Sequence, residues 1–488
     1  MKLSRVTHSA LAAWGRHYPR NMGDCSMTRL NKIGADRRTC ALVGGVWVVG
    51  IIIVGAAAFT PKRVEAVPAF ADQTTQPCKA CHVGGFGPEL TPFGREFKLG
   101  GYTLRARSSA PLSAMAVASW THTNKDQVPP PDNLSANNNL ALDQVSGFLA
   151  GGVGKHLGGF VQVTYDGVGK AWSWDNLDLR VVTPVQLFGK ESILGISFNN
   201  SPTVQDPWNT YAAWGFPYTD TAVSATPDAG PVIDGAFAQE TLGLTGYAWI
   251  NSEFYLEAGG YSTPAHGTLS WLGADPDGPG DIHGIAPYGR IAWQHDVGGG
   301  TLELGGVAFK AALFPGRDRS SGFTDEYTDL GLDGSWVRTF ESGNQLSTNV
   351  RYVHETANLR ASCALELIGD GEDIGCGRYT LGEVRGTVGY SWRGRVGASL
   401  SAFDITGSAN SNVFGGASGK PDSNGLTGQV DFTPWGGGKS PLGPRFNARV
   451  GIQYTLYGKF NGMHRNWDGA GANATDNNAL RVFTWVAF

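Results

Sequence analysis

The feature that most restricts the fold of this chain is a period-two alternation of apolar and polar residues, which recurs from about residue 110 to the C-terminus. In one segment Val388, Tyr390 and Trp392 alternate with Thr387 and Ser391. This alternation predicts strands that have one apolar face and one polar face. It leaves two folds open, because a soluble β-sandwich and a membrane barrel both show it. Further segments of this kind lie at 253–258 and 448–456.

The lengths of the connections favour a membrane barrel. About sixteen strand-length segments are joined by links that alternate between short and long, as in bacterial outer-membrane barrels with short periplasmic turns and long outer loops. An even number of strands predicts that both termini are periplasmic. The short links lie at 151–154, 250–252, 298–300, 342–344 and 393–394, and the long ones at 123–142, 201–236, 262–283, 311–325, 357–377, 407–422 and 461–476.

Composition agrees with a lipid-facing barrel. Charged residues make up 16% of the chain, whereas soluble proteins carry about 25%. The mean hydropathy of −0.17 is nearly neutral. The net charge of −4 gives no indication of nucleic-acid binding. The chain also ends on an aromatic residue, Phe488, which resembles the C-terminal signal that the barrel-insertion machinery reads in outer-membrane proteins.

The N-terminal region predicts export. Basic residues precede an apolar stretch over 41–59, and small-residue patterns then allow cleavage after Ala66 or Ala71, as in a secretory signal peptide. The position is late for such a signal, so the true start is expected at Met22 or Met27. A retained membrane anchor is the alternative, since the stretch approaches the ~20 residues that span a bilayer.

A C-x-x-C-H motif, formed by Cys78, Cys81 and His82, follows the predicted signal peptide and indicates covalent attachment of one haem c. The two thiols form thioethers with the porphyrin, and the adjoining histidine is the proximal iron ligand. A thioredoxin-like site would need a βαβ context, and a zinc site would need a second pair of ligands nearby. The predicted organisation is a signal peptide over 1–66, a haem c segment over 67–109 and a barrel over 110–488.

The sixth iron ligand stays open. Met115 is a candidate, because the alternation over 112–122 points its side chain into the barrel if the opposite face meets lipid. A Met/His pair would raise the reduction potential. Alternatively, Met115 fills a gap in the packing, and the sixth site is open or is filled by a histidine. The histidines available are His122, His156, His266, His283, His295, His354 and His464.

The remaining cysteines each have an expected role. Cys25 and Cys40 fall in the segment to be removed, whereas Cys363 and Cys376 share a long link rich in glycine. A disulfide between these two would rigidify an exposed loop, although two free thiols are the alternative.

With these parts assigned, the chain resembles the fused cytochrome–porin family of bacterial outer membranes, which includes iron-oxidising cytochromes. The resemblance is carried by 67–71, 78–82, 88–99 and 101–102, with a further match at 175–180 in the barrel. It implies that the small haem segment plugs the barrel. It also implies that electrons pass from an extracellular donor such as Fe(II) to periplasmic cytochromes.

Electron transfer across the outer membrane is therefore the favoured function, with Fe(II):cytochrome c oxidoreductase activity as its enzymatic form. The main alternative is a porin or substrate channel with a structural or sensory haem plug, and a haem enzyme is a third possibility. Phe86, Phe93 and Phe97 are expected to shield the porphyrin or to pack a small domain. Mixed charges on the polar face of the strands would either guide cations or pair with one another; they include Asp178, Arg180, Glu257, Arg351, Arg385, Asp431 and Arg449.

Overall fold

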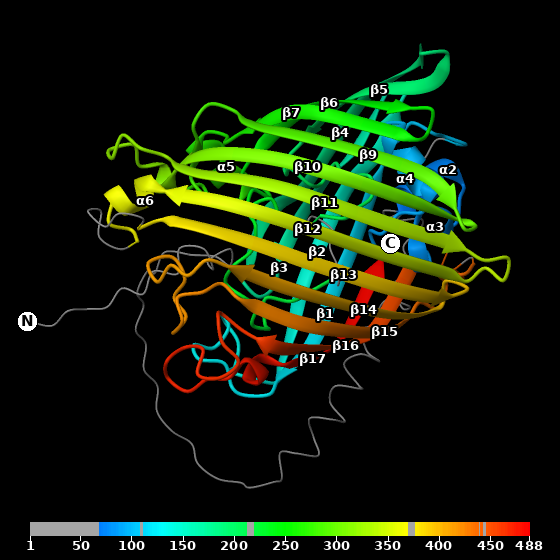
Figure 1. Ribbon diagram of the computed structural model, residues 1–488. Coiled ribbons are helices and arrows are strands. Elements are labelled where there is room, and N and C mark those ends of the chain that lie inside the picture. Colours follow the sequence, from blue (N-terminus) through cyan, green and yellow to red (C-terminus); the bar gives the residue numbers. More distant parts are fainter. Residues whose placement is uncertain (1–67, 108–110, 212–218, 369–375, 439, 443–445) are drawn as a thin grey trace, which may run out of the picture. The chain divides into compact units, whose positions relative to one another are not determined.

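The computed structural model describes residues 68–488, except 108–110, 212–218, 369–375, 439 and 443–445 (Figure 1). The predicted signal peptide over 1–66, with its cleavage site after Ala66 and the alternative starts at Met22 and Met27, lies outside the described residues. No helix in the described part is long and apolar enough to cross a membrane.

The strands form one closed antiparallel barrel. The sheet of the described chain contains seventeen strands. One of them, β8, has two residues and only extends the pairing of β10, which leaves sixteen strands in the barrel wall. Closure occurs where β1 pairs with β17, with Val117 opposite Trp485. The prediction of an all-β antiparallel barrel of about sixteen strands is thereby confirmed.

The bounds of the strands follow the alternating segments of the sequence. They are β1 (Leu112–Thr123), β2 (Asn139–Val153), β3 (Leu157–Asp166), β4 (Ala171–Leu187), β5 (Lys190–Asn199), β6 (Leu242–Ile250), β7 (Phe254–Ser262), β8 (Asp281–Ile282), β9 (Ala286–Val297), β10 (Gly300–Phe314), β11 (Asp325–Thr339), β12 (Gln345–Leu359), β13 (Arg378–Trp392), β14 (Val396–Gly407), β15 (Ser423–Phe432), β16 (Asn447–Lys459) and β17 (Ala479–Ala487).

The two faces of the strands differ as the alternation predicts. In β5, Ile196 and Phe198 are 51% and 38% exposed, whereas Ser197 and Asn199 are fully buried. Apolar side chains therefore cover the outside of the barrel and polar ones line its inside. This is the arrangement of a barrel that faces lipid.

Short turns join the strands at one end of the barrel and long connections join them at the other. The C-terminus lies at the short-turn end, where Ala114 and Phe488 exchange two backbone hydrogen bonds. The helices α5 (His266–Leu272) and α6 (Arg360–Ala364) lie at the opposite end in long connections (Figure 1). Two 3₁₀ turns, η3 (Pro315–Arg317) and η4 (Ala474–Asn477), also belong to long connections.

One long connection differs from the expectation. The connection between β5 and β6 contains the link predicted as an outer loop over 201–236, and its described parts, 200–211 and 219–241, fold into the barrel. The backbone N–H groups of Val232 and Ile233 donate to the inward carboxylates of Glu355 and Asp329. The physical reason is its apolar content, since Ile233 and Phe237 are each 1% exposed and belong to the core. We call this segment the inward connection.

The N-terminal described segment contains four short helices: α2 (Pro68–Thr74), α3 (Cys78–Cys81), the 3₁₀ turn η1 (Val83–Gly85) and α4 (Pro92–Leu99). The start of α4 follows from its sequence. The side chain of Thr91 caps the helix by accepting a hydrogen bond from the Gly94 N–H, and Pro92 occupies the first turn, where its missing N–H costs nothing.

Candidate haem-attachment site

The two cysteines of the C-x-x-C-H motif lie on one helical turn. Cys78 begins α3 and Cys81 ends it, so a spacing of three residues places both thiols on one face of the helix. Both are partly exposed, and neither is in a disulfide. His82 follows directly, and its backbone N–H donates to the Cys78 carbonyl at 2.8 Å. The motif is thus a compact unit that presents two thiols and one imidazole.

The segment that precedes and begins α4 holds the back of this motif. The Thr91 hydroxyl donates to the Ala80 carbonyl at 2.5 Å, and the Thr91 backbone N–H donates to the Cys81 carbonyl at 2.9 Å. Gly94 allows the close approach, because a Cβ there would lie 2.3 Å from the Cys81 carbonyl oxygen. The backbone of the motif is therefore fixed independently of any cofactor.

The surroundings of His82 favour its neutral form. The residue as a whole is partly exposed, but Nδ1 of its ring is buried without a hydrogen-bond partner among the described residues. Burial lowers the pKa of His82 to about 4, the carbonyl of Gly87 opposes this effect, and the Arg449 guanidinium adds to it. Burial also raises the pKa of Cys81 to about 12. A neutral imidazole is the form that ligates a metal, so these three residues fit covalent haem c.

The segment that carries the motif reaches several walls of the barrel. The Gly84 N–H donates to Gln345 Oε1 of β12 at 2.7 Å. On β16, Arg449 donates to the Phe86 carbonyl at 3.0 Å. On β6, the indole N–H of Trp249 donates to the Glu96 carboxylate at 3.0 Å. Because these strands lie far apart around the barrel, residues 84–96 cross its interior.

Buried cations tie α4 to the inside of the barrel. Arg95 is 2% exposed and donates to Gln294 on β9 and to Ser335 on β11. Lys98 is 4% exposed and donates to two carbonyls of the inward connection. Sequence analysis missed both residues, because arginine and lysine on a short helix ordinarily face solvent and nothing in the local pattern indicates otherwise.

The aromatic residues expected near the porphyrin differ in exposure. Phe86 and Phe97 are each 8% exposed, but Phe93 is 39% exposed. Phe86 packs edge-to-face against Trp485 with ring centres 4.7 Å apart. Phe86 and Phe97 are therefore buried enough to shield a bound porphyrin from solvent.

Met115 lies beside the same aromatic cluster. It packs against the group that contains Phe86 and Trp485. Its sulfur accepts a hydrogen bond from the Trp485 indole N–H at 3.3 Å. The side chain therefore points into the barrel, and its role as an iron ligand stays a prediction.

The charges predicted for the interior are mostly paired with one another. The clearest buried network surrounds Arg290, which contacts Asp333 at 2.7 Å and Glu303 at 3.3 Å. Such pairing is typical of a barrel interior in which buried charges of opposite sign neutralise one another. In the described residues, no three His, Cys, Asp or Glu side chains are grouped to hold a metal ion. Other ion pairs join Arg180 to Asp178, Arg351 and Arg385 to Glu383, and Arg449 to Asp431, while Glu257 accepts from Thr245 and Tyr255.

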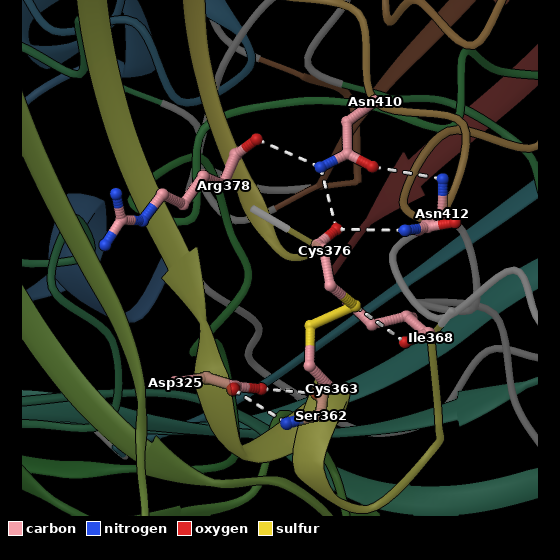
Figure 2. The surroundings of a disulfide bond; sticks show 8 residues. All are labelled: Asp325, Ser362, Cys363, Ile368, Cys376, Arg378, Asn410 and Asn412. Atoms are coloured by element: carbon pink, nitrogen blue, oxygen red, sulfur yellow. Dashed lines mark hydrogen bonds between the residues drawn. A yellow bond between two sulfur atoms is a disulfide. The ribbon is translucent and has the colours of Figure 1, made fainter. Parts of the chain in front are cut away.

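The second pair of cysteines forms a disulfide far from the motif. Figure 2 shows Cys363 of α6 joined to Cys376, just before β13. Both are buried. The amide of Asn410 donates to the carbonyls of Cys376 and Arg378 at 2.8 and 3.0 Å. The disulfide is thus part of a packed loop cluster.

Comparisons with known proteins gave similar structures but no relative by sequence. No protein-family model matches the chain, and no curated protein matches it. A loop L8 deletion mutant of OmpT, an outer-membrane protein of Vibrio cholerae, is 11% identical, with a TM-score of 0.41 over 77% of this chain and 98% of that chain. The outer-membrane channel DcaP of Acinetobacter baumannii is 10% identical, with a TM-score of 0.41 over 80% and 100%. OprB of Pseudomonas putida is 11% identical, with a TM-score of 0.43 over 77% and 94%.

Proposed function

We propose that this protein is an outer-membrane c-type cytochrome–porin that carries one covalent haem c on residues 67–109 and transfers electrons across the membrane. The observation that carries the proposal is the position of the C-x-x-C-H motif. Its helix α3 leads directly into a segment that hydrogen-bonds to β6, β12 and β16 inside the barrel.

The outer face of the barrel supports the location. Exposed side chains such as Leu194, Ile196 and Phe198 cover it, and an apolar outer face requires lipid. With short turns in the periplasm, both termini are periplasmic and α5 and α6 are extracellular. The motif would then be reached from the periplasm.

Each residue of the motif has a defined task. Cys78 and Cys81 would bind the porphyrin through thioethers, and His82 would be the proximal ligand. The bound haem supplies reversible one-electron exchange. Thr91 and Gly94 fix the backbone behind the motif, and Phe86 and Phe97 exclude water. A backbone fixed in this way suits electron transfer, because little has to rearrange when the charge changes.

The proposed direction is from an extracellular reductant such as Fe(II) to a soluble periplasmic cytochrome. The hydrocarbon core is ~30 Å thick. A redox group held at the periplasmic end of the barrel would be within reach of a soluble periplasmic carrier. On this proposal the activity is that of an Fe(II):cytochrome c oxidoreductase.

A substrate channel with a structural or sensory haem plug is the second candidate. The polar, charged interior favours it, because a barrel wall lined by ion pairs such as Arg351–Glu383 also suits water-filled pores. The two candidates predict different behaviour of the same reconstituted protein.

The experiment uses liposomes that enclose cytochrome c. The purified protein should allow external Fe(II) to reduce the enclosed cytochrome c, and His82→Ala should abolish the reduction. His266→Ala, which changes an exposed histidine of the outer helix α5, is the matched control and should retain it. Equal rates in wild type and His82→Ala would reject electron transfer through haem, and uptake of sugars without reduction would support the channel.

A further inference from the structure

Exposed basic side chains gather at the short-turn end of the barrel, the end that also carries α3. Carboxylates exposed at this end of the described chain are fewer, namely Glu191, Asp296 and Glu341. Partly exposed side chains at this end add the cation of Arg338 and the carboxylates of Glu89, Glu96 and Glu253. Among the fully exposed side chains of this surface the cations therefore outnumber the carboxylates, although the whole chain has a net charge of −4. We call it the basic rim; it consists of Lys79, Arg105, Lys155, Lys190, Arg393 and Arg395.

The basic rim lies close to the haem-attachment motif. Lys79 stands between the two cysteines of α3 and is exposed. The turn that carries Arg393 and Arg395 adjoins the residues just after His82, because the Gly436 carbonyl oxygen approaches both Gly85 and Gly394. A Cβ on Gly85 would lie 2.4 Å from that oxygen, and a Cβ on Gly394 would lie 2.9 Å from it. Positive charge therefore adjoins the proposed redox group.

A second part of the rim lies at the turn between β2 and β3. The guanidinium of Arg105 donates to the carbonyl of Gly152, and Lys155 follows in the turn itself. Gln73 of α2 binds the same residue, since it accepts from the Gly152 N–H at 2.9 Å. The N-terminal segment is thus bordered by cations where it meets two different turns.

We propose that the basic rim is the docking surface for a soluble, acidic one-electron carrier of the periplasm. This inference rests on the proposed function and specifies the partner's surface. Anionic phospholipid is the competing occupant, since cations on turns also bind headgroups. The positions of Lys79 and Arg105 favour the protein partner over anionic phospholipid. The two residues belong to a segment held inside the ring of strands, away from the lipid-facing wall, so a protein that covers the end of the barrel fits better.

Complementary charges at such a surface would raise the rate of association with the partner. A redox partner must bind briefly, in an orientation that brings its redox group near the haem, and must then leave. Opposite charges speed the encounter and fix its orientation without adding tight contacts. Steering of this kind raises association rates by about 10- to 1,000-fold and falls steeply with ionic strength. The rim therefore predicts fast, salt-sensitive binding.

The test measures binding, which requires no electron transfer. The full protein is placed in nanodiscs, and fluorescently labelled flavodoxin, an acidic one-electron carrier, is titrated at low salt. The triple variant Lys79→Glu, Arg393→Glu, Arg395→Glu should raise the Kd at least tenfold, and added salt should remove the difference. The matched control reverses Lys170, Lys420 and Arg465 to glutamate, which are exposed at the opposite end, and should leave the Kd unchanged.

Several outcomes would overturn the inference. They are an equal Kd in wild type and rim variant, an equal loss in the control variant, and a rim effect that occurs only with phosphatidylglycerol in the nanodisc. Folding of each variant is checked by its heat-modifiable mobility in electrophoresis. A haem-free Cys78→Ser, Cys81→Ser variant separates the two proposals, because it should still bind flavodoxin. If the wild type holds no haem but binds flavodoxin through the rim, only the proposed function fails.

Discussion

Lys98 donates a hydrogen bond to the Val204 carbonyl at 2.7 Å, and so joins the N-terminal segment to the inward connection. The same ammonium group donates to the Asp206 carbonyl at 3.0 Å. The amide of Asn209 adds a contact to the Pro88 carbonyl. Two segments that are distant in the sequence therefore fill the barrel together, one from each end. Each is expected to hold the other in place.

Replacing Lys98 should loosen this closure. The variant Lys98→Met keeps much of the side-chain volume but leaves two buried carbonyls without their donor, at a cost of about 1–3 kcal/mol for each unsatisfied group. We expect more frequent and larger open events in planar bilayers than for wild type. Lys79→Met, at an exposed lysine of the same segment, is the control. An unchanged conductance record for Lys98→Met would refute the role of this contact.

The charge on Lys98 should make stability depend on pH. Burial lowers the pKa of Lys98 from 10.5 to about 8. Between these values the unfolded chain binds more protons than the folded one, so stability rises with pH. Below pH 8 Lys98 is protonated in both the folded and the unfolded chain, so the full free-energy cost of burying its charge is present. From pH 8 to 10.5 the free energy of unfolding should rise by roughly 3 kcal/mol in wild type relative to Lys98→Met. Urea titrations of both proteins measure it, and parallel pH profiles would contradict it.

The barrel was predictable because the alternation that specifies each strand lies in residues that are neighbours in the sequence. Residues 387–392 alternate in the sequence and form part of β13 with the same alternation of faces, since the pleat imposes a period of two. The motif of Cys78, Cys81 and His82 was predictable for the same reason, as its chemistry depends on adjacent residues.

The filling of the barrel was not predictable from the sequence. The link at 201–236 has the length of an outer loop, and its direction is decided by partners far away in the sequence. The contact of Ile233 with Asp329 and that of Lys98 with Val204 are examples. Neither contact affects the local pattern of apolar and polar residues, so both could be identified only from the tertiary structure.

The ion pair between Asp234 and Arg351 should anchor the inward connection to β12. Arg351 is 3% exposed, and removal of one partner of a buried pair typically costs about 3–5 kcal/mol. We expect Asp234→Asn and Arg351→Gln each to destabilise the closed state, and the double variant to cost less than the sum. A double-mutant cycle on urea unfolding gives the coupling energy. Strict additivity would show that the two side chains act independently.

The disulfide between Cys363 and Cys376 should protect the loop that it closes. Its closed segment, with a sequence separation of 13 residues, corresponds to a stabilisation of about 3 kcal/mol in the chain-entropy model. The double variant Cys363→Ser, Cys376→Ser should lower the Tm and be cut faster by external protease. In wild-type protein a thiol reagent should label these positions only after reduction. Labelling without reduction would show that the thiols are free.

Met115 provides the sharpest test of the sixth ligand. Its sulfur accepts the Trp485 indole N–H and packs in the cluster of Phe86, so we expect a packing role. Met115→Leu should then leave the reduction potential of the haem unchanged and cost less than about 1.5 kcal/mol of stability, as volume-conserving swaps do. A Met ligand raises the potential, and a clear fall in the Met115→Leu variant would instead assign the sulfur to the iron. Met463→Leu, in the connection after β16, is the control. If it lowers the potential equally, the change reflects altered barrel packing, and neither methionine is then the ligand.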